Sequence, residues 1–136
     1  SKNTPMNRPL ISTLHLITCF IVALISVGCT SSPVQLNNFD ARSWKSDPNG
    51  CNQKRSQWVP VILEQKDKVL ALSETAVIDL LGKPDQIELY KRNQKLYHYQ
   101  ISPGAPCNSK DSVETELQVR FNAMGRAKEI YVNTIE

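Results

Sequence analysis

The sequence lacks a strong charge of either sign. Its 16 basic and 13 acidic side chains leave a formal net charge of +3. Lys2 and Arg8 are the only charged residues before Cys29, so the remaining chain carries 14 basic and 13 acidic residues. Proteins that bind nucleic acid concentrate positive charge on one surface to meet the phosphate backbone. A chain this close to neutral gives no electrostatic reason to expect nucleic acid as a partner.

The sequence also lacks the patterns that support catalysis or cofactor binding. It contains no glycine-rich phosphate loop and no Gly-x-Ser-x-Gly element. His98 is the only histidine after residue 28, and no second histidine stands at metal-ligand spacing. Flanked by Tyr97 and Tyr99, His98 is interpreted as ordinary sheet surface, and the pair Glu114 and Glu116 as a solvated strand edge. We therefore expect no catalytic residue, no metal site and no cofactor.

The N-terminal apolar run is too short for a stable membrane span. Residues 14–27 contain no charge and would form a helix of roughly 21 Å, whereas the hydrocarbon core of a bilayer is about 30 Å thick. Arg8 precedes this run and small residues end it, which is typical of a secretory signal. The sequence predicts a signal peptide at residues 1–28, with a retained single-pass anchor as the alternative.

A cysteine stands directly after the small residues that end this run. The stretch Ser26-Val27-Gly28-Cys29 resembles a lipobox, in which the cysteine is diacylated and becomes the mature N-terminus. Ser26 stands where that motif usually has leucine, and ordinary signal peptidase could cut the same bond and leave Cys29 without lipid. Residues 30–46 are polar with few large side chains. We expect a lipidated Cys29, a tether through residue 46, and anchoring in a bacterial envelope, at the outer membrane facing the periplasm.

Two cysteines, Cys51 and Cys107, remain beyond the predicted lipid site. In a chain exported to an oxidising compartment, a disulfide between them is the natural interpretation. It would close a loop of about 57 residues, which the chain-entropy model values at roughly 4 kcal/mol. A catalytic cysteine is the alternative, but no Cys-His-Asn pattern accompanies either residue.

Two helices are predicted in the first half of the folded region. Residues 58–66 are apolar and then charged, and Pro60 is compatible with a first helical turn. The second helix has clearer boundaries, because Ser73 can cap its N-terminus and Gly82 can end it. It is expected at residues 74–81, with an apolar stripe of Val77, Leu80 and Leu81.

The second half of the folded region alternates between apolar and polar residues, which is typical of strands. Turns are expected at residues 92–94 and 122–125. The sequence therefore predicts an α+β domain at residues 47–136, with one or two short helices packed on an antiparallel sheet of three to four strands. The face of the sheet toward the helices is expected to carry Ile87, Leu89, Leu117, Val119 and Phe121.

The segment Ala71-Leu72-Ser73-Glu74-Thr75-Ala76-Val77-Ile78-Asp79-Leu80-Leu81-Gly82-Lys83-Pro84 resembles a pattern of the SmpA/OmlA (BamE-like) family of outer-membrane lipoproteins. With the later aromatic and apolar strands, the resemblance covers roughly residues 70–133. Ala71 stands where the family usually has glycine, and Ala76 where it has a polar residue. The resemblance implies the helix-plus-sheet fold and a role in protein contacts within the envelope. It assigns no partner-binding residue, because no motif for one matches.

Two classes of function are consistent with these features. The first is a non-enzymatic protein-interaction module, held at the membrane by its lipid anchor, that serves outer-membrane protein assembly or envelope integrity through an envelope protein partner. The alternative is a periplasmic binder of a small ligand, or an inhibitor of a secreted enzyme, with Tyr90, Tyr97, Tyr99 and Tyr131 lining a groove. The exposed face of the sheet separates them, because a flat apolar patch favours a protein partner and a closed aromatic pocket favours a ligand.

Overall fold

The computed structural model describes residues 31–110 and 113–136. The predicted signal peptide at residues 1–28 and the predicted lipid site, Cys29, lie outside the described residues. The chain divides into a unit of residues 1–32 and a compact unit of residues 33–136, which contains the sheet and the helices. Among the residues described, no helix has the length and apolar character needed to cross a membrane.

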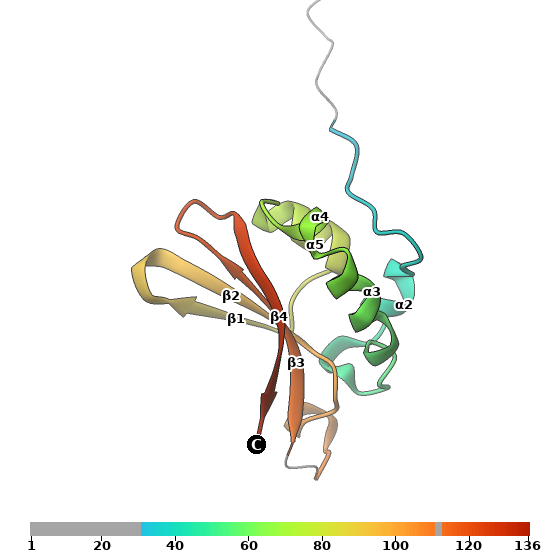
Figure 1. The fold of residues 1–136 in the computed structure, drawn as a ribbon. Coiled ribbons are helices and arrows are strands. Elements are labelled where there is room, and N and C mark those ends of the chain that lie inside the picture. Colours follow the sequence, from blue (N-terminus) through green and yellow to red (C-terminus); the bar gives the residue numbers. More distant parts are fainter. Residues whose placement is uncertain (1–30, 111–112) are drawn as a thin grey trace, which may run out of the picture. The chain divides into compact units, whose positions relative to one another are not determined.

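A four-stranded antiparallel sheet forms one layer of the domain, and its strands follow one another in chain order, β1-β2-β3-β4 (Figure 1). Tight turns connect β1 to β2 and β3 to β4, as the sequence predicted. A register shift interrupts the β3–β4 pairing between Arg120 and Phe121. The strands are β1 (Gln86–Tyr90), β2 (Gln94–Gln100), β3 (Glu114–Phe121) and β4 (Ala127–Ile135).

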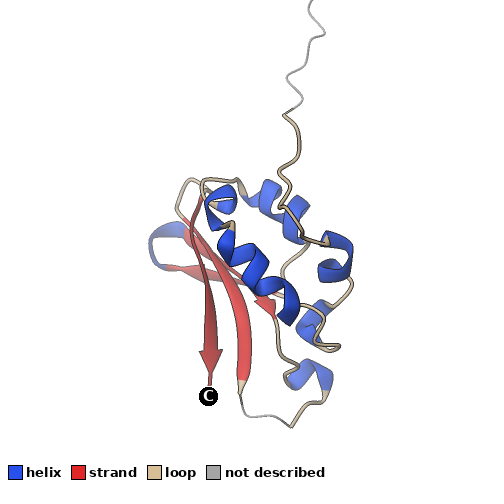
Figure 2. Cartoon of the chain, turned by 45° about the vertical axis from the view of Figure 1, so that its right-hand side comes forward, coloured by secondary structure: helices blue, strands red, loops and turns tan. Residues whose placement is uncertain are grey.

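Short helices form the second layer and lie on one side of this sheet (Figures 1 and 2). They are α2 (Ala41–Lys45), α3 (Val59–Glu64), α4 (Lys66–Val69) and α5 (Glu74–Leu81). The predicted α+β fold with an antiparallel sheet is confirmed. The helix expected at residues 58–66 is shorter, because the backbone leaves the helical conformation at Gln65 before α4 begins.

Helix α5 has the boundaries that its capping residues predicted. The Ser73 hydroxyl accepts a hydrogen bond from the backbone N–H of Ala76 at 3.2 Å, and Gly82 ends the helix at a φ of 82°. The predicted stripe of Val77, Leu80 and Leu81 is buried. Burying this stripe against the sheet stabilises a helix of only eight residues, which would be marginal alone.

The core lies between the two layers. Its sheet side is formed by alternate residues of β2, β3 and the first half of β4 that point toward the helices, as the period of a strand requires. Its helix side is formed by residues from every helix of the second layer and from the segment before α2. The buried apolar members include Leu36, Trp44, Ile62, Val69, Val77, Leu81, Tyr97, Tyr99, Leu117, Val119, Phe121 and Ile130.

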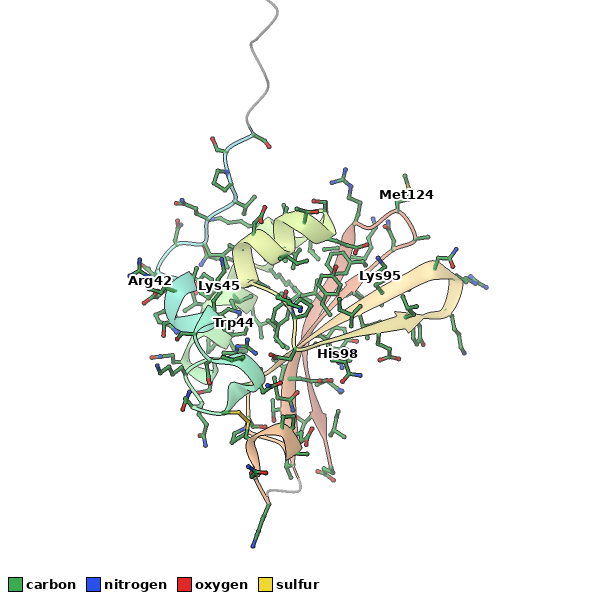
Figure 3. The ribbon with its side chains drawn as sticks, turned by 180° about the vertical axis from the view of Figure 1, so that it is seen from behind. Arg42, Trp44, Lys45, Lys95, His98 and Met124 are labelled. Atoms are coloured by element: carbon green, nitrogen blue, oxygen red, sulfur yellow. A yellow bond between two sulfur atoms is a disulfide. The ribbon has the colours of Figure 1, made fainter. Side chains whose placement is uncertain are left out.

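The predicted tether through residue 46 is wrong from Leu36 onward, because this segment belongs to the folded domain. Asp40 caps α2 by accepting hydrogen bonds from the backbone N–H groups of Arg42 and Ser43. Trp44, a residue of α2 that Figure 3 labels, is completely buried, and its indole Nε1 donates to the carbonyl of Leu81 at 2.8 Å. A tryptophan in a polar stretch is not part of a repeating apolar pattern that would predict its burial. Residues distant in the sequence decide that burial.

A second expectation fails at β1. Ile87 and Leu89 were predicted to face the helices within the core, but they are 50% and 77% exposed. The register pairs Ile87 with Tyr97 and Leu89 with Lys95, so both lie on the helix side of the sheet. In Figure 1 the β1–β2 hairpin extends away from the helices, so the helical layer does not reach these two side chains.

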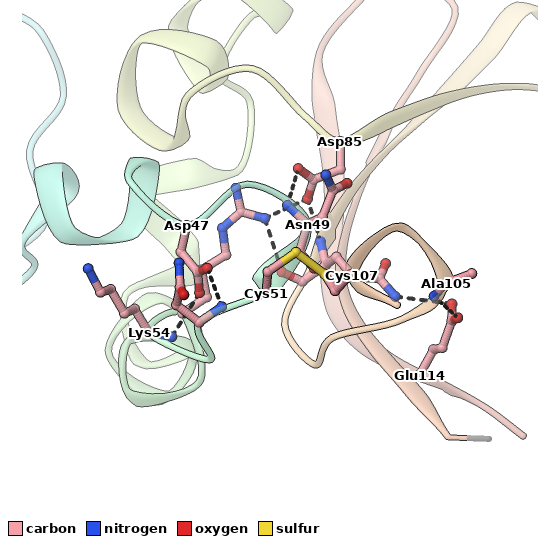
Figure 4. The surroundings of a disulfide bond; sticks show 11 residues. Asp47, Asn49, Cys51, Lys54, Asp85, Ala105, Cys107 and Glu114 are labelled. Carbon is pink, nitrogen blue, oxygen red and sulfur yellow. Dashed lines mark hydrogen bonds and ion pairs between the residues drawn. A yellow bond between two sulfur atoms is a disulfide. The ribbon is translucent and has the colours of Figure 1, made fainter. Parts of the chain in front are cut away.

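The predicted disulfide between Cys51 and Cys107 is present, with the two Cα atoms 5.4 Å apart (Figure 4). It links the loop after α2 to the loop after β2. Beside it, Arg55 is only 2% exposed and pairs with Asp85, with 2.5 Å between Nη1 and Oδ2. Asp85 also accepts from the backbone N–H groups of Asn49 and Gln100. Covalent and ionic links therefore hold the same loop against the sheet.

Candidate functional site

The side of the sheet away from the helices carries the candidate site, which we call the outer face. It is formed by alternate residues that the strand registers place side by side. Across one row, Glu88 lies opposite Leu96, Leu96 opposite Arg120, and Arg120 opposite Glu129. A second row aligns Gln86, His98, Gln118 and Tyr131. No described helix covers this face (Figures 1 and 2).

His98 is the centre of a buried polar cluster on the outer face. Its side chain is only 8% exposed, so the interpretation as ordinary sheet surface is wrong. Nδ1 lies 2.9 Å from Oε1 of Glu116, within hydrogen-bond distance. The amide of Gln118 donates to the same oxygen. The cluster joins the middle strands, β2 and β3, by side-chain contacts as well as by backbone hydrogen bonds.

The other imidazole nitrogen of His98 faces the edge strand. Nε2 lies 3.3 Å from Oε2 of Glu88 and makes no hydrogen bond, although the atom is buried from solvent. Protonation of the ring would turn this contact into an ion pair, giving the imidazole a carboxylate on each side. Glu116 is buried in this cluster, so the prediction that it lies on a solvated edge is also wrong. Its burial follows from the neighbouring side chains, which strand periodicity alone does not indicate.

An open depression of about 460 Å³ adjoins this cluster. Arg120 is fixed within it, since two of its nitrogens contact the Glu129 carboxylate at 2.8 and 2.7 Å and Nη1 donates to Gln94 at 2.6 Å. The bidentate geometry gives the guanidinium a defined orientation. The lining residues are Tyr90, Gln94, Leu96, Arg120, Glu129 and Tyr131.

The charges in this depression influence one another. The hydrogen bond from Arg120 lowers the pKa of Glu129 more than its slight burial raises it. Partial burial, followed by the nearby Glu129 carboxylate, raises the pKa of Tyr131, although Arg120 acts in the opposite direction. The depression therefore presents a paired arginine and carboxylate beside a neutral phenol at physiological pH.

The four tyrosines predicted to line one groove are divided between the two faces. Tyr90 and Tyr131 border the depression and remain partly exposed. Tyr97 and Tyr99 are buried under the helices, where their hydroxyl groups donate to Glu74 and to the carbonyl of Gly82. The structure thus brings two of the four together, in an open depression instead of a closed aromatic pocket.

Among the described residues, no group of three or more His, Cys, Asp or Glu side chains is arranged so that it could hold a metal ion. Glu88 and Glu116 lie on opposite sides of the His98 ring, so they do not converge on one point. Gln118 was not identified from the sequence. Its place directly opposite His98 follows from the alternation of β3, but only once the strand register is known.

Comparison of the chain with protein-family models, curated proteins and solved structures finds no match. The resemblance to the SmpA/OmlA family stays a prediction based on the residues quoted for it.

Proposed function

We propose that this chain is a small bacterial envelope lipoprotein that binds another envelope protein through the outer face of its sheet and performs no catalysis. Cys29 would carry the lipid and hold the domain at the outer membrane, on its periplasmic side. The process served would be outer-membrane protein assembly or envelope integrity. Nucleic acid has no part in this proposal.

The observation that carries the proposal is the composition of the uncovered outer face. Tyr90 and Tyr131 are partly exposed around the buried Leu96, and Arg120 is held in place between them by Glu129 and Gln94. Tyrosine and arginine are enriched at protein interfaces. Tyrosine has few free rotations, and Arg120 is already held in place by Glu129 and Gln94, so these side chains lose little entropy on binding. An open surface of this kind fits a protein partner better than a small ligand, which needs an enclosing pocket.

Two further observations support the envelope assignment. The disulfide between Cys51 and Cys107 is a bond that persists in oxidising compartments. Ala71 has a φ of 68°, in the left-handed region that favours glycine, and the SmpA/OmlA pattern has glycine at this position. A backbone geometry that suits the family's usual residue supports the resemblance, although the residue itself differs.

The anchor is tested by mass spectrometry of the mature N-terminus from the native host. We expect a diacylated or triacylated Cys29, and a Cys29→Ser variant should leave the membrane fraction. A cleaved chain with a free cysteine at this position, or an uncleaved chain that is still membrane-bound, would contradict the lipid anchor.

The interaction is tested by placing a photo-crosslinking amino acid at Tyr90, at Tyr131 and, as a control, at the exposed Asp67 of α4. In intact cells, both outer-face positions should capture the same partner, and the control should not. Arg120→Ala should reduce this capture, because the variant lacks the guanidinium that Glu129 and Gln94 hold at the contact surface. Equal capture at all three positions, or none at either tyrosine, would contradict a partner on the outer face.

A further inference from the structure

One edge of the sheet is open along its whole length. Strand β1 pairs with β2 on one side, and no described strand pairs with its other side. All five residues of β1 are exposed. In an antiparallel pair, alternate residues direct their backbone N–H and C=O groups away from the partner strand. β1 therefore offers a row of backbone donors and acceptors that another extended chain could pair with.

Two large apolar side chains accompany this edge. Ile87 and Leu89 lie on the helix side of the sheet but beyond the helical layer, where they are among the most exposed apolar residues of the described chain. They stand two residues apart, which is the spacing of side chains on one face of a neighbouring strand. An added strand could cover both with apolar side chains of its own at alternate positions.

Several features that usually protect a sheet edge are missing from β1. Its five residues include no proline or lysine and a single charge, Glu88, and its pairing with β2 continues without a register shift. The opposite edge differs at its beginning, where Ala71 and Leu72 exchange backbone hydrogen bonds with Ala127 of β4 at 2.8 and 2.9 Å. Lys128 also lies on that strand. The two edges are thus unequal, and β1 is the less protected one.

The charge next to β1 indicates the chemistry of a partner. The turn that follows the strand carries Lys91 and Arg92, both exposed and without an ion pair among the residues that the structure describes. The nearby Lys95, by contrast, is neutralised by Glu74 at 2.9 Å. An acidic residue near one end of an added strand would meet the two unpaired cations.

We infer that β1 accepts an extended segment of another protein as a fifth strand, with apolar residues over Ile87 and Leu89 and an acidic residue beside Lys91 and Arg92. A second copy of this chain fits less well. Antiparallel pairing of two β1 strands over their full length places Glu88 opposite Glu88, and like charges directly opposite destabilise a strand pair. The inference rests on the proposed interaction function, for which it names the chemistry of the partner segment.

The probe is a short synthetic peptide that alternates valine and threonine and carries aspartates at one end. Its binding to the full oxidised chain is measured by NMR titration, and amide hydrogen exchange shows where it pairs. We expect slower exchange for amides of β1 and no change along the exposed half of β4. A peptide methylated on alternate backbone nitrogens removes the donors needed for pairing, so it should not bind.

Matched substitutions locate the contact. Leu89→Lys should weaken binding of the peptide by about tenfold or more, because the charge would lie under the added strand. Met124→Lys, at an equally exposed position in the β3–β4 turn (Figure 3), should change the affinity by less than about twofold. Replacing Lys91 and Arg92 together by glutamate should reverse the preference, so that a peptide ending in lysines binds better than one ending in aspartates.

Several outcomes would overturn the inference: tight binding of the methylated peptide, equal effects of Leu89→Lys and Met124→Lys, protection on β4 instead of β1, or an unchanged preference after charge reversal. Absence of peptide binding would also refute it. If crosslinking from Tyr131 still captured a partner in that case, the interaction function would stand and only strand addition at β1 would fail.

Discussion

Replacing Arg55 by methionine should destabilise the domain more than any surface substitution. The guanidinium is almost completely buried and lies over the ring of Trp44, with 5.1 Å from Cζ to the ring centre. It pairs with Asp85, whose side chain is itself only 10% exposed, and donates to the carbonyl groups of Trp44 and Gln100. Methionine fills part of the volume but leaves a buried carboxylate and two carbonyl groups without this donor.

The expected magnitude follows from what remains after the substitution. Removing one partner of a buried ion pair costs about 3–5 kcal/mol, because the other charge stays buried and uncompensated. Asp85 keeps its two backbone donors, from Asn49 and Gln100, so the lower half of this range is expected, about 3 kcal/mol. Since domains of this size are stable by about 5–15 kcal/mol in total, the loss would be a large fraction.

Urea unfolding of the oxidised chain, followed by circular dichroism, measures this loss. Arg42→Met is the matched control, because Arg42 is exposed on α2, and it should change the free energy of unfolding by less than about 0.5 kcal/mol. The double variant Arg55→Met with Asp85→Asn should lose less than the sum of its single variants, since the two residues are in contact. A loss below about 1 kcal/mol for Arg55→Met, or losses that add, would refute the reasoning.

Four further predictions concern the core, the disulfide and two polar contacts. Leu80→Ala should lower the free energy of unfolding by about 2–5 kcal/mol in a urea melt, and a fully stable variant would mean that α5 is not core. Reducing the disulfide should lower the free energy of unfolding by about 4 kcal/mol, because the bond joins residues 56 positions apart in the sequence. Urea midpoints with and without reductant measure this loss, and equal midpoints would exclude a stabilising role. Burial raises the pKa of Glu74, but hydrogen bonds from Lys95 and Tyr97 and the Lys95 charge outweigh it and lower the pKa below its usual 4.5. The stability that ionised Glu74 contributes is therefore complete above that pH and is lost as the pH falls below it. When the free energy of unfolding is measured as the pH is lowered, Glu74→Gln should lose less of it than wild type. Equal losses in the two proteins would contradict this. His98→Ala should cost about 1 kcal/mol, because the buried Glu116 carboxylate loses its contact with the imidazole and keeps the Gln118 amide as a donor, and a thermal melt equal to wild type would show that the cluster contributes nothing.

Local signals in the sequence were sufficient for α5 and for the strands. Ser73 and Gly82 define the ends of the helix through hydrogen bonds within a few residues, so neither depends on distant parts of the chain. The alternation of β3 likewise identified the residues that face the core, Leu117, Val119 and Phe121. Elements whose boundaries and faces are set by neighbouring residues could therefore be predicted with their correct orientation.

Features that depend on which segments meet in space could not be predicted in this way. Trp44 is buried because Leu81 and Tyr99 surround it, and both are far away in the sequence. Leu89 has the alternation of a core residue, but the extent of the helical layer decides its exposure. His98 shows the same dependence at the candidate site, since the carboxylate that binds it comes from the neighbouring strand.

The burial of Leu36 has a consequence for how far the domain can reach from a membrane. If Cys29 carries the lipid, only residues 30–35 separate the anchor from the first side chain fixed in the core. A fully extended chain spans at most about 3.5 Å per residue, so this tether is at most roughly 25 Å long. A tether ending at residue 46 would have allowed more than twice that length. The domain would then work close to the lipid headgroups, and any protein that it binds must present its contact segment within this distance plus the width of the domain itself.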